Sequence, residues 1–94
     1  MTASHNPSFA FPEGVLAREV EGEMVLLNLN SEQYYGLDRV GADMVTRLTR
    51  EPEEQALAAL CRDYEVDDQV LRADVERLVQ ELQGAGLLER RQSH

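Results

Sequence analysis

The chain has 94 residues, of which 43% are apolar, and this predicts one small globular domain with a single modest core. It contains 18 Asp and Glu but only nine Lys and Arg, so its formal net charge is −9. A field of this sign repels phosphate backbones and anionic lipids, which counts against nucleic acid and membrane surfaces as partners. The charge favours a neutral or basic partner. A core this small also leaves little room for an enclosed active-site cavity.

The cysteine content and the N-terminal segment favour a cytoplasmic protein. Cys61 is the single cysteine, so no intramolecular disulfide can form. The N-terminus lacks the positively charged segment and apolar run of a signal peptide. No apolar stretch approaches the ~18 residues of a membrane-spanning helix.

The two ends of the chain are predicted to be loose. Residues 1–12 mix Thr, Ser, His, Asn and two prolines, which is typical of a flexible arm. Phe9 and Phe11 could pin the end of this arm to the domain. We therefore expect a folded domain over residues 13–89 and a flexible tail over residues 90–94.

Three strands are predicted in the first half of the domain. Residues 15–20 and 24–29 are rich in Val and Leu and flank a glycine turn, which indicates a β-hairpin. Residues 33–37, "QYYGL", follow a second turn and form a short third strand. A simple antiparallel meander leaves this strand at an edge of the sheet.

The alternation of side chains divides the third strand into two faces. Tyr35 and Leu37 share one face, and Tyr34 and Gly36 share the other. We expect Tyr35 to point toward the core and Tyr34 to be freer.

Three helices are predicted after the third strand. Asp38 and Asp67 are suitable N-caps for the first and third helices, and Pro52 suits the first position of the second. Gly84 and Gly86 are typical stop signals for the third helix. Each helix has apolar residues at helical spacing: Val40, Met44, Val45 and Leu48 in the first, Leu57, Leu60 and Cys61 or Tyr64 in the second, and Val70, Leu71, Val75, Leu78, Val79 and Leu82 in the third.

The order of three strands followed by three helices predicts the fold class. Three strands cannot hide both of their faces, so the helices must cover one of them. We expect an α+β fold of winged helix-turn-helix type, with a three-stranded antiparallel sheet followed by three helices.

The sequence offers no convincing catalytic or metal-binding group. The two histidines, His5 and His94, lie in the expected loose ends, and Cys61 lies beside an apolar helix stripe, as a structural thiol does. The acidic clusters at 51–54 and 65–68 fall at helix starts, where capping accounts for them. We expect neither an enzyme nor a cofactor.

Binding is the function that these features favour. The third strand has an unpaired outer edge, to which an extended peptide can add as a further strand. The third helix is the natural second wall of such a groove, with Asp74, Arg77 and Glu81 at its flank. Most apolar residues of that helix belong to the core, so only a subset of them can line a groove.

Two segments resemble the PqqD-like family, the recognition elements of ribosomally made, modified peptides. They are "MVLLNLNSEQYYGLDRVGADMVTRL" and "ALCRDYEVDDQVLRADVERLVQELQGAGLLE", and the resemblance covers residues 14–89. It implies a three-stranded sheet on three helices that binds a leader peptide as an antiparallel strand between the third strand and the third helix. The implied peptide-binding residues are Tyr34, Tyr35, Gly36 and Leu37 on one wall and Val70, Leu71, Asp74, Val75 and Leu78 on the other.

The chain is most similar to the stand-alone leader-binding protein of split lasso-peptide processing proteases. This resemblance implies a precursor peptide and a separate cysteine protease as partners, with the cyclase as a further candidate. Relatives in pyrroloquinoline quinone biosynthesis usually have an Asp-Gly turn after the first helix, where this chain has "TREPEE" over residues 49–54.

Two alternatives stay open. The first is a chaperone that delivers a precursor peptide to a radical SAM maturase. The second is a winged-helix transcription regulator, which the acidic third helix disfavours because DNA binding requires a basic one.

Overall fold

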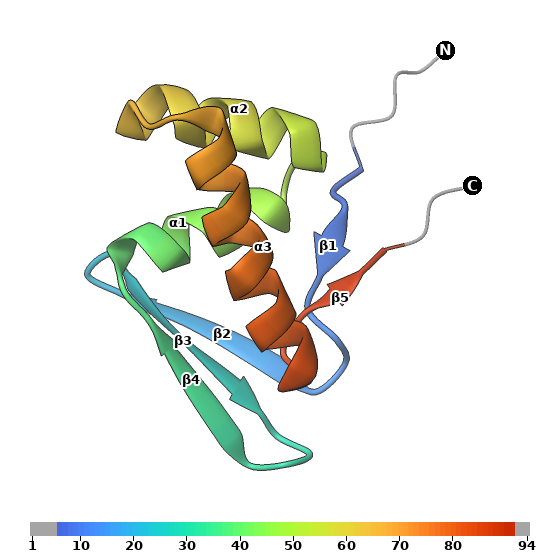
Figure 1. Ribbon diagram of the computed structural model, residues 1–94. Coiled ribbons are helices and arrows are strands. Elements are labelled where there is room, and N and C mark those ends of the chain that lie inside the picture. The colour runs from blue at the N-terminus through green and yellow to red at the C-terminus, as the bar shows by residue number, and fades with distance from the viewer. Residues whose placement is uncertain (1–5, 92–94) are drawn as a thin grey trace.

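The computed structural model describes residues 6–91 and confirms the predicted α+β fold (Figure 1). A three-stranded antiparallel sheet of order β2-β3-β4 is followed by three helices, and two short strands near the chain ends form a separate pair. The elements are β1 (Phe9–Ala10), β2 (Val15–Val20), β3 (Glu23–Asn28), β4 (Gln33–Leu37), α1 (Arg39–Leu48), α2 (Glu53–Tyr64), α3 (Asp68–Gly84) and β5 (Glu89–Arg90).

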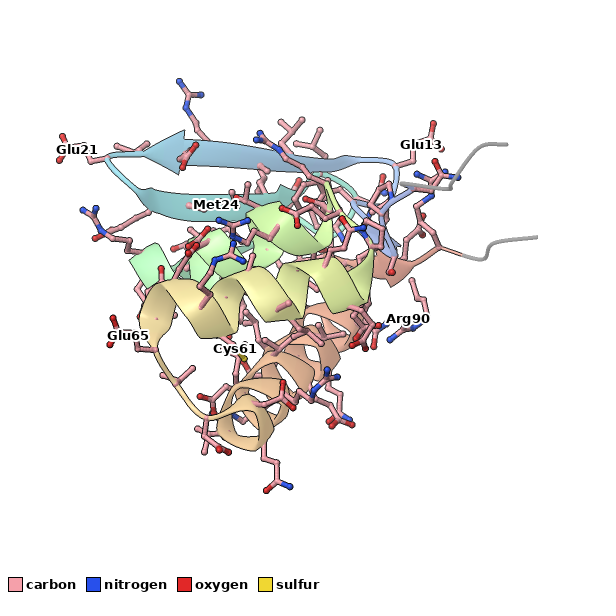
Figure 2. All side chains as sticks on the ribbon, turned by 90° about the horizontal axis from the view of Figure 1, so that it is seen from above. Glu13, Glu21, Met24, Cys61, Glu65 and Arg90 are labelled. Atoms are coloured by element: carbon pink, nitrogen blue, oxygen red, sulfur yellow. The ribbon has the colours of Figure 1, made fainter. Side chains whose placement is uncertain are left out.

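All three helices lie on one side of the sheet. The two views agree on this arrangement, with β2, β3 and β4 forming one layer and α1, α2 and α3 the other (Figures 1 and 2). Met24 pairs with Leu37 and Leu26 pairs with Tyr35 across β3 and β4, so these side chains share the face toward the helices. Met24, Leu26 and Leu37 are buried there. The expected inward direction of Tyr35 is confirmed, since its side chain packs against the core.

Both predicted helix caps are confirmed, whereas Pro52 does not occupy the predicted first position of α2. The Asp38 carboxylate accepts a hydrogen bond from the Gly41 amide at 2.8 Å, and that of Asp67 accepts one from the Gln69 amide at 3.0 Å. Pro52 instead lies one residue before the helix, with extended backbone (φ −56°, ψ 148°) and no side-chain acceptor. A distant residue supplies the missing acceptor.

That residue is Ser8, whose Oγ accepts from the Glu53 amide at 2.9 Å. Ser8 precedes β1, which pairs with β5 so that Phe9 lies opposite Arg90. The Phe9 side chain is fully buried, and the Arg90 guanidinium lies 4.5 Å from the centroid of its ring. Residues 8–10 are therefore integrated into the fold, whereas the sequence predicted a flexible arm over residues 1–12. His5 and His94 lie outside the described residues.

Gly86 ends α3 with a positive φ of 73°. The amide of Leu87 donates to the Leu82 carbonyl at 2.8 Å, and the amide of Gly86 donates to that of Gln83 at 3.1 Å. These two bonds form a Schellman motif, which requires a residue in the left-handed region and therefore favours glycine. Gly84 is the last residue of the helix itself.

The core lies between the sheet and the helices. Its largest fully buried side chains are Phe9, Val45, Leu26, Leu48, Leu60, Leu82 and Leu87. Within residues 6–91, no helix combines the length and apolar character needed to cross a membrane.

Candidate functional site

Strand β4 has an open outer edge. It pairs with β3 on one side, and over residues 6–91 no strand pairs with its other side. Every second residue of an edge strand turns its amide and carbonyl outward, where another chain can bind them. Tyr34 is 76% exposed on the face away from the helices. The predicted edge strand is thus present and available.

A hydrogen bond connects β4 to α3. The Tyr35 hydroxyl donates to the Glu81 carboxylate, which fixes the position of the strand relative to the last turns of the helix. This bond, together with desolvation and the negative charge of Glu81, raises the pKa of the Tyr35 phenol above its ordinary value. The phenol therefore stays protonated and donating at neutral pH.

A hollow of about 260 Å³ lies between the N-terminal end of α1 and one face of α3. Val40 and Leu78 give it apolar walls, and Asp74 forms an ion pair with Arg77 at 2.8 Å on its rim. Three carboxylates and one guanidinium surround the hollow, which therefore suits an apolar side chain with a basic neighbour. Its lining residues are Asp38, Val40, Gly41, Met44, Asp74, Arg77, Leu78 and Glu81.

The structure divides the predicted residues of α3 between this hollow and the core. Asp74 and Leu78 line the hollow and are half-buried. Val70 is 55% exposed one turn before Asp74, on the same helix face. Leu71 and Val75 are each only 3% exposed and belong to the core.

Val75 instead borders a hollow on another side of α3. This hollow of about 290 Å³ is lined by Phe9, Glu53, Leu57, Arg72, Val75, Glu76, Val79 and Arg90. Helix periodicity identified the apolar residues of α3 correctly, but the rotation of the helix over the sheet decides which of them reach β4.

The residues of β4 divide in the same way. Leu37 is buried in the core, so only its backbone is available at the edge. Gly36 lies on the outer face beside Tyr34, as predicted. Tyr35 reaches α3 through its hydroxyl.

Two apolar residues of the hollow were not among the predicted site residues. Val40 and Met44 have the helical spacing of a core stripe and were assigned to the core. Met44 is buried, but Val40 is 40% exposed in the first turn of α1. The position of Val40 in the sequence indicates its place in the hollow. It lies in the first turn of a helix that directly follows the edge strand and its N-cap.

Cys61 is held as a thiol between α2 and α3 (Figure 2). Its sulfur lies 3.7 Å from an Asp68 carboxylate oxygen. Desolvation raises the pKa of the thiol, and the charge and hydrogen bond of Asp68 add to the effect. A nucleophilic cysteine instead needs a lowered pKa, which favours the reactive thiolate. Within the part of the chain that the structure describes, no cluster of side chains has the composition of a metal site.

The outer face of the sheet, away from the helices, exposes apolar side chains beside the charged Arg18 and Glu23. Register places Leu16, Val20, Val25, Leu27 and Tyr34 on this face. All of them except the half-buried Leu27 are strongly exposed. Exposed apolar side chains gathered in one patch indicate an interaction surface.

Solved structures similar to this chain contain a leader peptide. TbiB1 in complex with the TbiA(beta) leader peptide is 28% identical, with a TM-score of 0.81, and the match covers 89% of this chain and 99% of that one. Lasso peptide synthetase B1 complexed with the leader peptide is 24% identical, with a TM-score of 0.74, and the match covers 87% and 98% of the two chains. The second likeness supports the fold alone. No curated protein sequence matches.

Residues 23–88 match the family described as Coenzyme PQQ synthesis protein D (PqqD). The matched segment runs from the first residue of β3 to the residue before β5 and includes β4, the hollow and α3. It covers well over half of the chain, and the resemblance derived from the sequence is confirmed. The chain belongs to the PqqD family.

Proposed function

We propose that this protein is a non-catalytic recognition element for the leader segment of a ribosomally made precursor peptide of the lasso type. The observation that carries the proposal is the open edge of β4 beside the hollow on α3. The leader-bound state of TbiB1, a structure of the same fold over almost its whole length, supports it.

The leader binds as a further strand on β4. Main-chain hydrogen bonds to the outward amides and carbonyls provide affinity that does not depend on the leader sequence. Side chains of the added strand alternate, so every second one points toward the helices. There it enters the hollow between Val40 and Leu78, and Asp74 and Glu81 favour a basic residue nearby.

The bound leader is then presented to a separate cysteine protease. The outer face of the sheet supplies an apolar surface for that enzyme around Leu16, which is exposed there without a covering element in residues 6–91. The chain itself performs no chemistry: its single cysteine has a raised pKa and carries its hydrogen bond to a carboxylate.

A binding titration tests the proposal. A labelled lasso-type leader peptide, such as the TbiA(beta) leader, is titrated with the full chain, and bound fraction is measured by fluorescence anisotropy. Leu78→Asp places a charge in the apolar wall of the hollow, so we expect affinity to fall at least about tenfold, the cost of leaving one aliphatic contact unmade. Val66→Asp is the matched control, because Val66 is an exposed valine between α2 and α3, outside the hollow.

The two variants separate the outcomes. Circular dichroism first establishes that both remain folded. If wild type and Leu78→Asp bind the leader equally tightly, the proposal that the leader occupies the groove beside Leu78 is refuted. A radical SAM maturase encoded beside the gene, in place of a protease and a cyclase, would change the enzyme to which the leader is delivered.

A further inference from the structure

Gly36 occupies a place in β4 where the fold does not need glycine. Its φ lies outside the left-handed region, so its backbone conformation is open to any residue. A Cβ built on it meets no heavy atom within 4 Å, so packing does not require glycine either. A glycine inside a strand weakens that strand. Within the described residues, neither the backbone conformation nor the packing therefore accounts for a glycine at this position.

Gly36 borders a hollow at the end of the sheet where β2, β3 and β4 meet the start of α1. The hollow has a volume of about 570 Å³ and extends over Gly36 and its cross-strand partner Val25, with Val20 beside them. Val25 and Val20 are exposed, so the floor is apolar. Buried Met24 and Leu37 also border it, and charged residues surround its end: Glu21, Glu23, Asp38 and Arg39.

We propose that this hollow receives an aromatic side chain of the leader, a second specificity site on the opposite face from the hollow on α3. The inference rests on the proposed function, because it needs a strand added to β4. In such a strand, the residue directly opposite Gly36 points to the outer face of the sheet. Its side chain then lies over Gly36.

The chemistry of the hollow selects an aromatic ring. A ring laid across a strand glycine covers the backbone that the glycine leaves bare, a known device of β-sheets. Tyr34 lies two residues away on the same face and is 76% exposed, which places it within diagonal reach of that ring. Val25 provides the apolar contact on the other side. The leader is thus recognised on both faces of its strand.

Two glycine substitutions separate recognition from folding. Gly36→Val places a branched side chain over the part of the hollow beside β4 and introduces a residue that strands favour, so we expect the unfolding midpoint to stay equal or rise. Gly84→Ala is the matched control, because a Cβ at Gly84 also meets no heavy atom within 4 Å and the residue lies at the end of α3.

The probe is a displayed library of random peptides selected on the full-length protein. Peptides are kept only if they lose binding to Leu78→Asp, which restricts them to the groove beside β4. We expect them to share an aromatic residue. We expect Gly36→Val to bind the strongest peptide about tenfold more weakly, and Gly84→Ala to bind it like wild type. Replacing that aromatic residue by Ala should abolish the difference between Gly36→Val and wild type.

Two results overturn the inference and leave the proposed function standing. The first is that Gly36→Val binds the selected peptides as tightly as the wild type does, while these peptides still require Leu78. The second is that Gly36→Val weakens the binding of the aromatic peptide and of its Ala variant by the same factor. That result would indicate that the substitution disturbs the edge of β4. If no selected peptide depends on Leu78, the proposed function itself fails.

Discussion

Phe9→Ala should strongly destabilise the domain, although Phe9 lies in a segment whose composition is typical of a flexible arm. The ring is fully buried, and truncations of this kind cost about 3–5 kcal/mol. Loss of the contact with the Arg90 guanidinium adds ~0.5–1 kcal/mol. A domain of this size has a total free energy of unfolding of about 5–10 kcal/mol, so the substitution removes at least about a third of it.

Urea unfolding followed by far-UV circular dichroism measures this loss, and a thermal scan should show a fall of more than about 10 °C. Phe11→Ala is the matched control, because Phe11 is only half-buried against the same core and should lose clearly less. A Phe9→Ala midpoint within error of wild type would refute the burial of β1 and the role of the β1–β5 pair. Equal losses for both variants would show that Phe9 has no special position.

Two further predictions concern a helix cap and the thiol. Asp38→Ala removes the acceptor for the Gly41 amide and should lower the free energy of unfolding by about 1 kcal/mol; an unchanged urea midpoint would contradict the capping role. Cys61 should react with iodoacetamide more slowly in the folded chain than in urea between about pH 7 and pH 9, because its pKa is raised by desolvation and by Asp68. The folded state holds this proton more tightly, so the stabilisation is complete below the ordinary thiol pKa and is lost as pH rises through the raised one. Faster alkylation of the folded protein would refute that environment.

The sequence predicted those features that depend on local patterns. Asp38 and Asp67 are followed directly by the amides that they cap, so their role follows from a few neighbouring residues. The strand at residues 33–37 and its two faces follow from side-chain alternation. The family resemblance extended these local predictions to the correct fold.

Features that join distant residues were not predictable in the same way. Strands β1 and β5 have two residues each, too few to show any alternation, and their pairing joins opposite ends of the chain. The Ser8 cap on α2 spans 45 positions. Leu71 and Leu78 are equally apolar in sequence, and only the rotation of α3 over the sheet assigns one to the core and the other to the hollow.

The pairing of β1 with β5 also has a consequence for protein engineering. It holds the first and last strands side by side, at a corner of the molecule separate from β4 (Figure 1). Neighbouring ends permit a short linker to join them and new ends to be opened in an exposed turn. Opening the chain between residues 28 and 33 would make β4 the first element of a circular permutant. A peptide fused ahead of β4 could then fold back on its free edge, which would make a tethered complex in one chain.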